Sequence, residues 1–260
     1  QSQAAARDLD EARRELAEER RRAEADLARE AAAKLVDEIK GALIRQQHIV
    51  AETERYEALK QTGKLTRAAA LGLLDLAREQ ESLAEEARAT AERLASAAAF
   101  RLALDGAAGD MNRAAQLLRE RRTDAGVLRA EQAAVRRYAQ LLDALKPSSG
   151  QGPAGGGQEG GSGGQGGQQA SNDDSVSAAE LRLLKLMQED LNVRTKELDE
   201  LRRRGPLPLD RREEFERLGD EQGELADLLV ELLGAAADGD GGSPSPERKP
   251  GDLESPGGKP

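Results

Sequence analysis

Leucine and alanine recur at helical spacing along most of this chain, and almost no aromatic side chain accompanies them. Aromatic residues make up 2% of the 260 positions, with two Phe, two Tyr and no Trp. An aromatic side chain buries about 150–250 Å² and usually supplies much of a wide core. Abundant Ala, Leu, Glu and Arg with a helical period favour long helices that meet along narrow seams. We therefore predict an all-α fold with coiled-coil character.

The composition also narrows the chemistry that the chain can perform. The absence of Cys excludes disulfides, thiolate catalysis and Cys-based metal sites. His48 is the only histidine, and a single His rules out the usual helical di-iron site. A formal net charge of -10 argues against a nucleic-acid partner. We expect no enzyme activity, no cofactor and no metal.

The first part of the chain is predicted to be one long helix, from about Ala4 to Lys60. It contains no Pro, and its only Gly is Gly41. Residues 1–35 are polar nearly all round, which is typical of a solvated stalk or a frayed helix. We expect this stalk to project from the body or to pair with a partner helix.

Residues 36–146 are predicted to form an antiparallel bundle of three helices. Gly63 marks the first turn, and Thr66 is a suitable N-cap for the second helix. That helix is expected to continue to Asp105–Gly106, where glycine can supply a left-handed cap.

The last segment of this bundle is less regular. Asp110 can cap a short helix as far as Leu118, and Thr123–Asp124 interrupts or restarts it. Pro147 ends the segment. One seam position is polar, because Glu131 stands where the heptad spacing calls for an apolar residue.

A Gly- and Gln-rich stretch separates the bundle from a second helical unit. Residues 147–175 hold almost no apolar side chains, so we expect a flexible linker. No Gly-Lys-Ser/Thr follows its glycines, which argues against a phosphate-binding loop. Residues 176–234 predict a helical hairpin that starts at the capping box Ser177–Glu180. Residues 235–260 are expected to form a disordered tail.

The apolar residues at seam spacing are the candidate core and pairing positions. They are Ile39, Leu43, Leu76, Leu83, Leu94, Val135, Tyr138, Leu142, Leu191, Leu198, Leu225 and Leu232. Alanine-rich seams bury less apolar area than leucine seams. We therefore expect modest stability, with self-association supplying the remainder.

Glutamine recurs at related positions in three of the expected helices. Gln47, Gln80 and Gln222 each precede an apolar residue by three positions. A buried polar residue in a seam can fix the register of the helices at a cost in stability. The same pattern also arises by chance in helices rich in Gln and Leu, and both readings stay open.

Five arginines gather at the tip of the predicted hairpin. Positive charge at a helix C-terminus is favourable, and such a cluster could also hold an anionic surface. A solvated turn is the alternative. The five residues are Arg202, Arg203, Arg204, Arg211 and Arg212.

Several runs resemble a group of bacterial helical proteins of unknown function, rich in Ala, Leu and Gln. The runs are Arg78–Ala84, Ala99–Leu104 and Asp110–Ala115. Members of that group are often expected to be exported or membrane-anchored through an N-terminal segment. The resemblance implies a cell-envelope location and brings no catalytic residues with it.

These observations favour a structural or interaction protein over an enzyme. We expect it to pair through coiled-coil seams with itself or with other helical proteins. The alternative function is a charge-driven module that binds anionic surfaces through the arginine-rich hairpin tip. Nucleic acid is not an expected partner, and membrane contact would need a segment upstream of Gln1.

Overall fold

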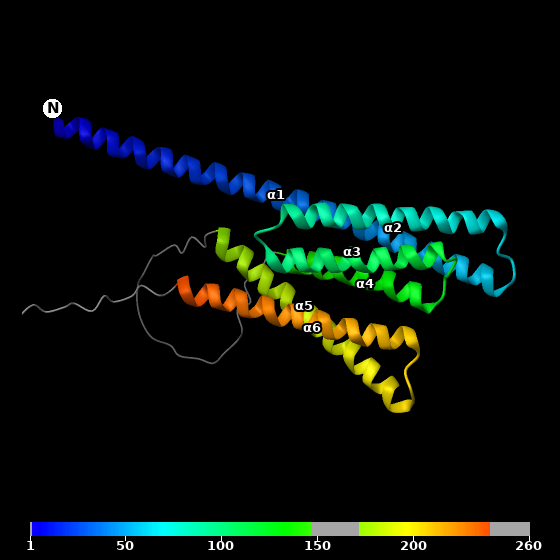
Figure 1. Ribbon diagram of the computed structural model, residues 1–260. Coiled ribbons are helices and arrows are strands. Elements are labelled where there is room, and N and C mark those ends of the chain that lie inside the picture. The colour runs from blue at the N-terminus through cyan, green and yellow to red at the C-terminus, as the bar shows by residue number, and fades with distance from the viewer. Residues whose placement is uncertain (1, 147–171, 240–260) are drawn as a thin grey trace, which may run out of the picture.

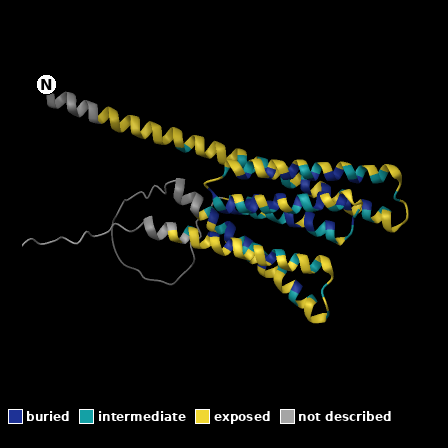
Figure 2. Cartoon of the chain, viewed as in Figure 1, coloured by how far each residue is buried: buried dark blue, intermediate teal, exposed yellow. Residues whose placement is uncertain are grey.

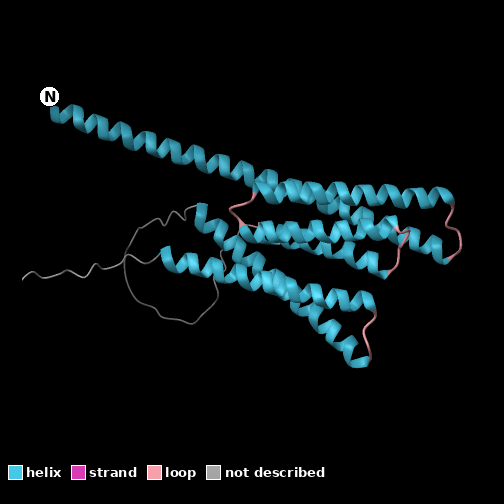
Figure 3. Ribbon diagram, in the orientation of Figure 1, coloured by secondary structure: helices cyan, strands magenta, loops and turns pink. Residues whose placement is uncertain are grey.

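Every secondary-structure element in the described residues, 2–146 and 172–239, is an α-helix (Figures 1 and 3). The computed structural model therefore confirms the all-α prediction. The helices are α1 (Ser2–Gln61), α2 (Arg67–Arg93), α3 (Ala98–Arg119), α4 (Ala125–Ala144), α5 (Asn172–Arg204) and α6 (Leu209–Gly239). The predicted linker lies outside the described residues up to position 171, as does most of the predicted tail.

Helix α1 passes through two environments. Residues 11–34 are exposed, except for the half-exposed Ala25, and this part extends away from the other helices (Figures 1 and 2). From Leu35 onward the helix buries side chains such as Ile39 and Ile49. Packing thus begins where large apolar residues first recur at three- and four-residue spacing.

Helices α1–α4 pack around a shared core. α3 packs against α2 and α4, and α1 lies mainly on α4. Small side chains are frequent among the buried residues of α2 and α3, and these two helices are in close contact. The buried alanines of the two helices are Ala77, Ala84, Ala87, Ala91, Ala99, Ala103, Ala107, Ala108, Ala114 and Ala115.

The predicted helix through Asp105–Gly106 is wrong, and the bundle has four helices where three were predicted. α2 ends at Arg93, and a turn at Leu94–Ala97 leads into α3. This turn contains no Gly or Pro, which are the strongest sequence signals of a break. The break is therefore set by contacts with other parts of the chain.

One such contact is made by Glu180 of α5. Ala97, the N-cap of α3, makes no side-chain capping bond. Instead, the Ala99 amide donates to Glu180 Oε1 over 3.3 Å. The predicted capping box is wrong because α5 begins at Asn172, so Ser177 lies inside the helix and Glu180 serves α3.

Gly106 and Asp110 both lie inside α3, so the short helix predicted to start at Asp110 is also wrong. A Cβ on Gly106 would lie 2.7 Å from Arg137 Cζ. Asp110 accepts from Arg137 Nε at 3.0 Å. Both residues therefore serve the packing of Arg137 on α4 and leave the helix unbroken.

The locally encoded helix starts are confirmed. Thr66 Oγ1 accepts from the Ala69 amide at 3.2 Å. Asp124 is the N-cap of α4 and accepts from the Gly126 amide at 2.8 Å. Gly63 adopts a left-handed φ of 68° in the turn after α1.

Helices α5 and α6 form the C-terminal hairpin. α5 packs against α3 and α4 as well as α6, and buries Leu183, Met187 and Leu191 among other apolar residues. α6 continues through Gly234 to Gly239, five residues beyond the predicted end. Glycine permits a helix end without imposing one.

Candidate functional site

The predicted seam residues lie in the interior of the chain's own fold. Ile39, Leu76, Leu83, Tyr138, Leu191, Leu198 and Leu225 are buried, and Leu43, Leu94, Val135, Leu142 and Leu232 are partly buried. Sequence analysis missed Ile49 and much of the α3 face, including Phe100 and Met111. Since these seams are occupied internally, a partner must meet a different surface.

The exposed part of α1 is one such surface. Leu16 and Leu27 are 67% and 66% exposed. Ion pairs within the helix stabilise it, including Arg20–Glu24 at 2.6 Å. Such exposed pairs add only a few tenths of a kcal/mol each. The ion pairs therefore do not compensate for the exposure of Leu16 and Leu27, which pack against no other described helix.

At the hairpin tip, the arginines that end α5 are exposed. Arg202 pairs with Asp199 at 3.4 Å and lies 5.7 Å from the centre of the Phe215 ring. Arg203 and Arg204 are exposed, and neither side chain forms a hydrogen bond or ion pair with another described residue. Two of the five predicted cations are thus free to meet a ligand.

The arginines that begin α6 are used inside the hairpin. Arg211 donates to Glu214 at 2.6 Å. Arg212 donates to the Leu207 carbonyl oxygen at 2.9 Å and helps to hold the turn. The tip therefore presents less free positive charge than the sequence alone indicates.

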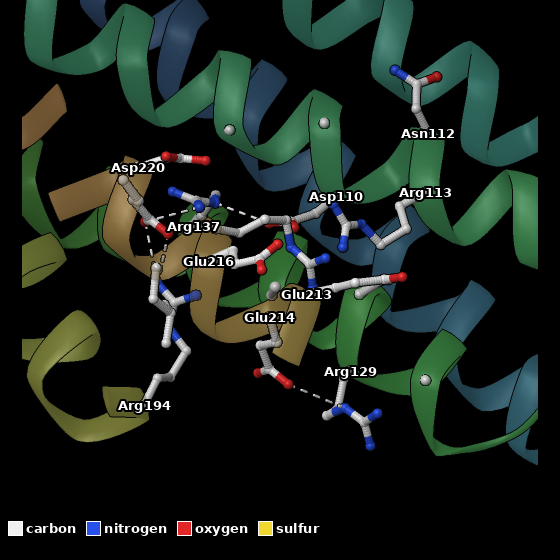
Figure 4. Close-up of a pocket in the computed structure, with 18 of the residues that line it drawn as sticks. Asp110, Asn112, Arg113, Arg129, Arg137, Arg194, Glu213, Glu214, Glu216 and Asp220 are labelled. Atoms are coloured by element: carbon white, nitrogen blue, oxygen red, sulfur yellow. Dashed lines mark hydrogen bonds and ion pairs between the residues drawn. The ribbon is translucent and has the colours of Figure 1, made fainter. Parts of the chain in front are cut away.

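A cleft of about 830 Å³ lies between the α3–α4 face and the hairpin (Figure 4). Its walls carry opposite charge. The α3–α4 wall contributes the basic residues Arg113, Arg122, Arg129, Arg136 and Arg137, with Asp110 as its acid. The α6 wall contributes the acidic residues Asp210, Glu213, Glu214, Glu216, Asp220, Glu221 and Glu224, with Arg217 as its base.

Arg137 is the centre of the contacts across this cleft. Its side chain is 11% exposed and binds Asp110 at 3.0 Å and Glu221 at 2.9 Å. Glu221 also accepts from Arg194 of α5 at 3.0 Å. Helices α3 and α4 are therefore joined to both helices of the hairpin through two carboxylates and two guanidinium groups.

Burial and charge act against each other in this network. Burial raises the pKa of the Asp110 carboxyl, and the Arg137 guanidinium opposes that rise. Burial works against the charge of Arg137, but Asp110 and Glu221 outweigh it and raise its pKa. Arg137 thus stays positively charged, and this charge holds the carboxylates of Asp110 and Glu221.

A second polar cluster lies in the core between α1, α2 and α4. Gln46, Thr53, Gln80 and Glu131 are all fully buried. Thr53 Oγ1 donates to Glu131 Oε1 at 2.8 Å, and Gln46 Nε2 reaches the Glu131 carbonyl oxygen at 3.4 Å. Burial raises the pKa of Glu131 to about 8.

The glutamine pattern in the sequence divides into three different situations. Gln80 is buried beside Glu131, whereas Gln47 is exposed and its neighbour Gln46 takes the core position. Gln222 exchanges two amide hydrogen bonds with Gln188, at 3.0 and 3.1 Å. A polar seam position that fixes register therefore fits Gln80 and not Gln47.

Two other features are absent from the described part of the chain. No group of three or more His, Asp or Glu side chains there is arranged to hold a metal ion. No helix among those residues combines the length and the apolarity needed to cross a bilayer. His48 lies exposed on α1.

No known protein family matches this chain, and no curated protein or solved structure is detectably similar to it. The resemblance to bacterial helical proteins, with the envelope location that it implies, therefore stays a prediction. The surfaces described above carry the functional argument alone.

Proposed function

We propose that this chain is a non-enzymatic interaction protein whose exposed N-terminal helix pairs with the same segment of a second copy. The observation that carries the proposal is the exposure of Leu16 and Leu27 on a helix that meets no other described element over residues 11–34. A lone helix of this kind gains little from its charge pairs. Pairing would bury its large apolar side chains.

The apolar residues of this segment fall on one face. Ala12, Leu16, Ala23 and Leu27 follow one another at intervals of four, seven and four residues. Their eleven-residue repeat corresponds to about 3.67 residues per turn, which suits two nearly straight helices with a slight right-handed supercoil. Alternation of Ala with Leu lets a leucine of one helix pack beside an alanine of the other.

The charge of the segment favours a second copy as the partner. Residues 11–34 hold seven basic and seven acidic side chains, although the whole chain has a net charge of -10. Two such segments carry no net charge and do not repel each other. An acidic or basic partner would gain no long-range attraction from the segment.

Dilution of the purified chain tests this proposal. We expect the mass in solution to fall from dimer to monomer, and the helicity of the chain to fall with it, because a lone polar helix frays. Replacing Leu16→Lys with Leu27→Lys should leave a monomer at all concentrations. Light scattering and far-ultraviolet circular dichroism measure both quantities.

The matched control adds the same charge to the opposite face of the helix, through Ala25→Lys with Ala32→Lys. That variant should associate as the parent chain does. A parent chain that is monomeric at every concentration, or a control variant that dissociates as readily as the leucine variant, contradicts the proposal.

A further inference from the structure

The hairpin is attached to the bundle in two different ways. α5 buries Leu183, Met187 and Leu191 in the common core. Leu218 is the one apolar residue that α6 adds to the cleft lining, and ion pairs join α6 to Arg129 and Arg137 of α4. α6 is therefore the part of the hairpin that the bundle holds by charge.

The ionic contacts follow a regular spacing. Arg129 binds Asp210 and Glu214, and Arg137 binds Glu221. The residue numbers of the paired side chains increase together along the two helices, so α6 runs parallel to α4. Arg129 and Arg137 stand eight residues apart, and Glu214 and Glu221 seven, so each pair spans about two helical turns, or about 10.5–12 Å.

α6 uses only part of the basic wall. Arg122 pairs with Asp124, and Arg136 pairs with Asp190 of α5. The buried Nε of Arg113 has no hydrogen-bond partner among the described residues. On the opposite side, Glu213, Glu216 and Glu224 bind none of these arginines. The cleft of about 830 Å³ that remains between the two walls is consistent with this incomplete pairing.

We propose that the arginine wall of α3 and α4 is a binding groove for an acidic helix of a partner protein, and that α6 occupies it as an intramolecular competitor. The groove is expected to bind a helix that carries carboxylates one or two turns apart on one face. This helix lies parallel to α4, between α3 and α5, where α6 lies now. This groove is independent of the pairing proposed for α1.

The surroundings of the groove favour a helix over a phosphate polymer or a membrane. Asp110 and Asp190 stand among the arginines and would repel a continuous row of phosphates. Met187 and Arg194 of α5 line another side of the groove. The space that remains is that of a single helix.

Competition with α6 predicts how the groove is regulated. A partner binds only the fraction of molecules in which α6 has left, so its apparent affinity is lowered by that fraction. Weakening the grip of α6 should strengthen binding of an added acidic helix. The three carboxylates that touch the wall are the ones to change.

The experiment uses the full chain and a labelled peptide that copies residues 207–234. The release variant carries Asp210→Asn, Glu214→Gln and Glu221→Gln, and circular dichroism verifies its helicity. Fluorescence anisotropy should show at least about tenfold tighter peptide binding by this variant than by the parent chain. Adding Arg129→Gln should abolish the gain, and salt should weaken the binding.

The matched control removes the same charge from α6 at positions that do not touch the wall. It carries Glu213→Gln, Glu216→Gln and Glu224→Gln, and should bind the peptide as the parent does. Equal gains in both variants overturn the proposal, because charge alone then explains binding. A scrambled peptide that binds the release variant equally well overturns recognition by helical spacing.

Two further outcomes assign the groove to another occupant. If the release variant prefers phosphatidylserine vesicles to the peptide, the groove binds anionic headgroups and the helix proposal is wrong. If the parent chain forms a dimer that Leu16→Lys with Leu27→Lys does not dissociate but Arg129→Gln does, a second copy's α6 is the occupant and the partner protein is excluded.

Discussion

Two polar clusters lie inside this Ala- and Leu-rich protein, and they are buried in opposite ways. Glu131 in the bundle core meets a hydroxyl and amide groups, with no cation among the described contacts. Arg137 beneath the hairpin meets two carboxylates. The first cluster keeps its carboxyl neutral, and the second balances its charges. The first cluster is therefore sensitive to pH, and the second to the loss of a charged partner.

The largest expected effect is the loss of Arg137. Arg137→Met leaves Asp110 and Glu221 without their shared cation, and breaking such a pair costs about 3–5 kcal/mol in the free energy of unfolding. Urea denaturation measures that change. Arg136→Met is the neighbouring control, because Arg136 is 41% exposed and its ion pair is with Asp190. It should cost about 1 kcal/mol or less, and equal losses would show that Arg137 holds no special position.

A comparable effect, spread over a range of pH, is expected at Glu131. Its usual pKa of 4.5 rises to about 8 on burial. Between these values the unfolded chain releases the proton and the folded chain keeps it, so the free energy of unfolding falls as pH rises. The slope reaches about 1.4 kcal/mol per pH unit and vanishes above pH 8.

Glu131→Gln removes this slope, because the amide has no proton to release. Its advantage over the parent should therefore be greatest at and above about pH 8 and vanish below about pH 4.5. Urea denaturation across this range measures it. The exposed Glu54→Gln is the control and should keep the slope of the parent. An unchanged slope in Glu131→Gln would mean that the carboxyl is already ionised in the folded core.

The smallest expected effect compares two glycines one turn apart in α3. Gly109→Ala meets nothing within 4 Å and should stabilise the helix by about 1 kcal/mol. Gly106→Ala places its Cβ 2.7 Å from Arg137 Cζ, so it should lose that gain and destabilise the chain. Thermal unfolding measures both. Equal rises in Tm would show that Arg137 moves aside freely.

The features that sequence predicted well are local. Thr66, Asp124 and Gly63 act on residues within one turn, so their chemistry is visible in a few letters. The turn at Leu94–Ala97 was not visible, because its stabilising partner is Glu180, 81 positions from Ala99. Gly106 was misread for a related reason. A glycine that ends a helix and one that makes room for a distant arginine look alike in sequence.

The candidate sites show the same division. The stalk was predicted because the polar residues that define it follow one another within a single helix. The hairpin-tip arginines were singled out because they are adjacent, but Arg211 and Arg212 are engaged within the hairpin. The charged cleft was missed, because its walls come from segments far apart in the chain. The signal available was the row of acidic residues between Asp210 and Glu224 of α6.

The bond between Glu180 and the start of α3 has a consequence for where this protein can be divided. Leu183, Met187 and Leu191 share the core of the first four helices, so the segments on either side of residues 147–171 complete one another. A chain cut between those segments would yield an N-terminal fragment with an uncapped helix and an open apolar face. The two segments that the Gly- and Gln-rich stretch separates in the sequence therefore belong to one folding unit.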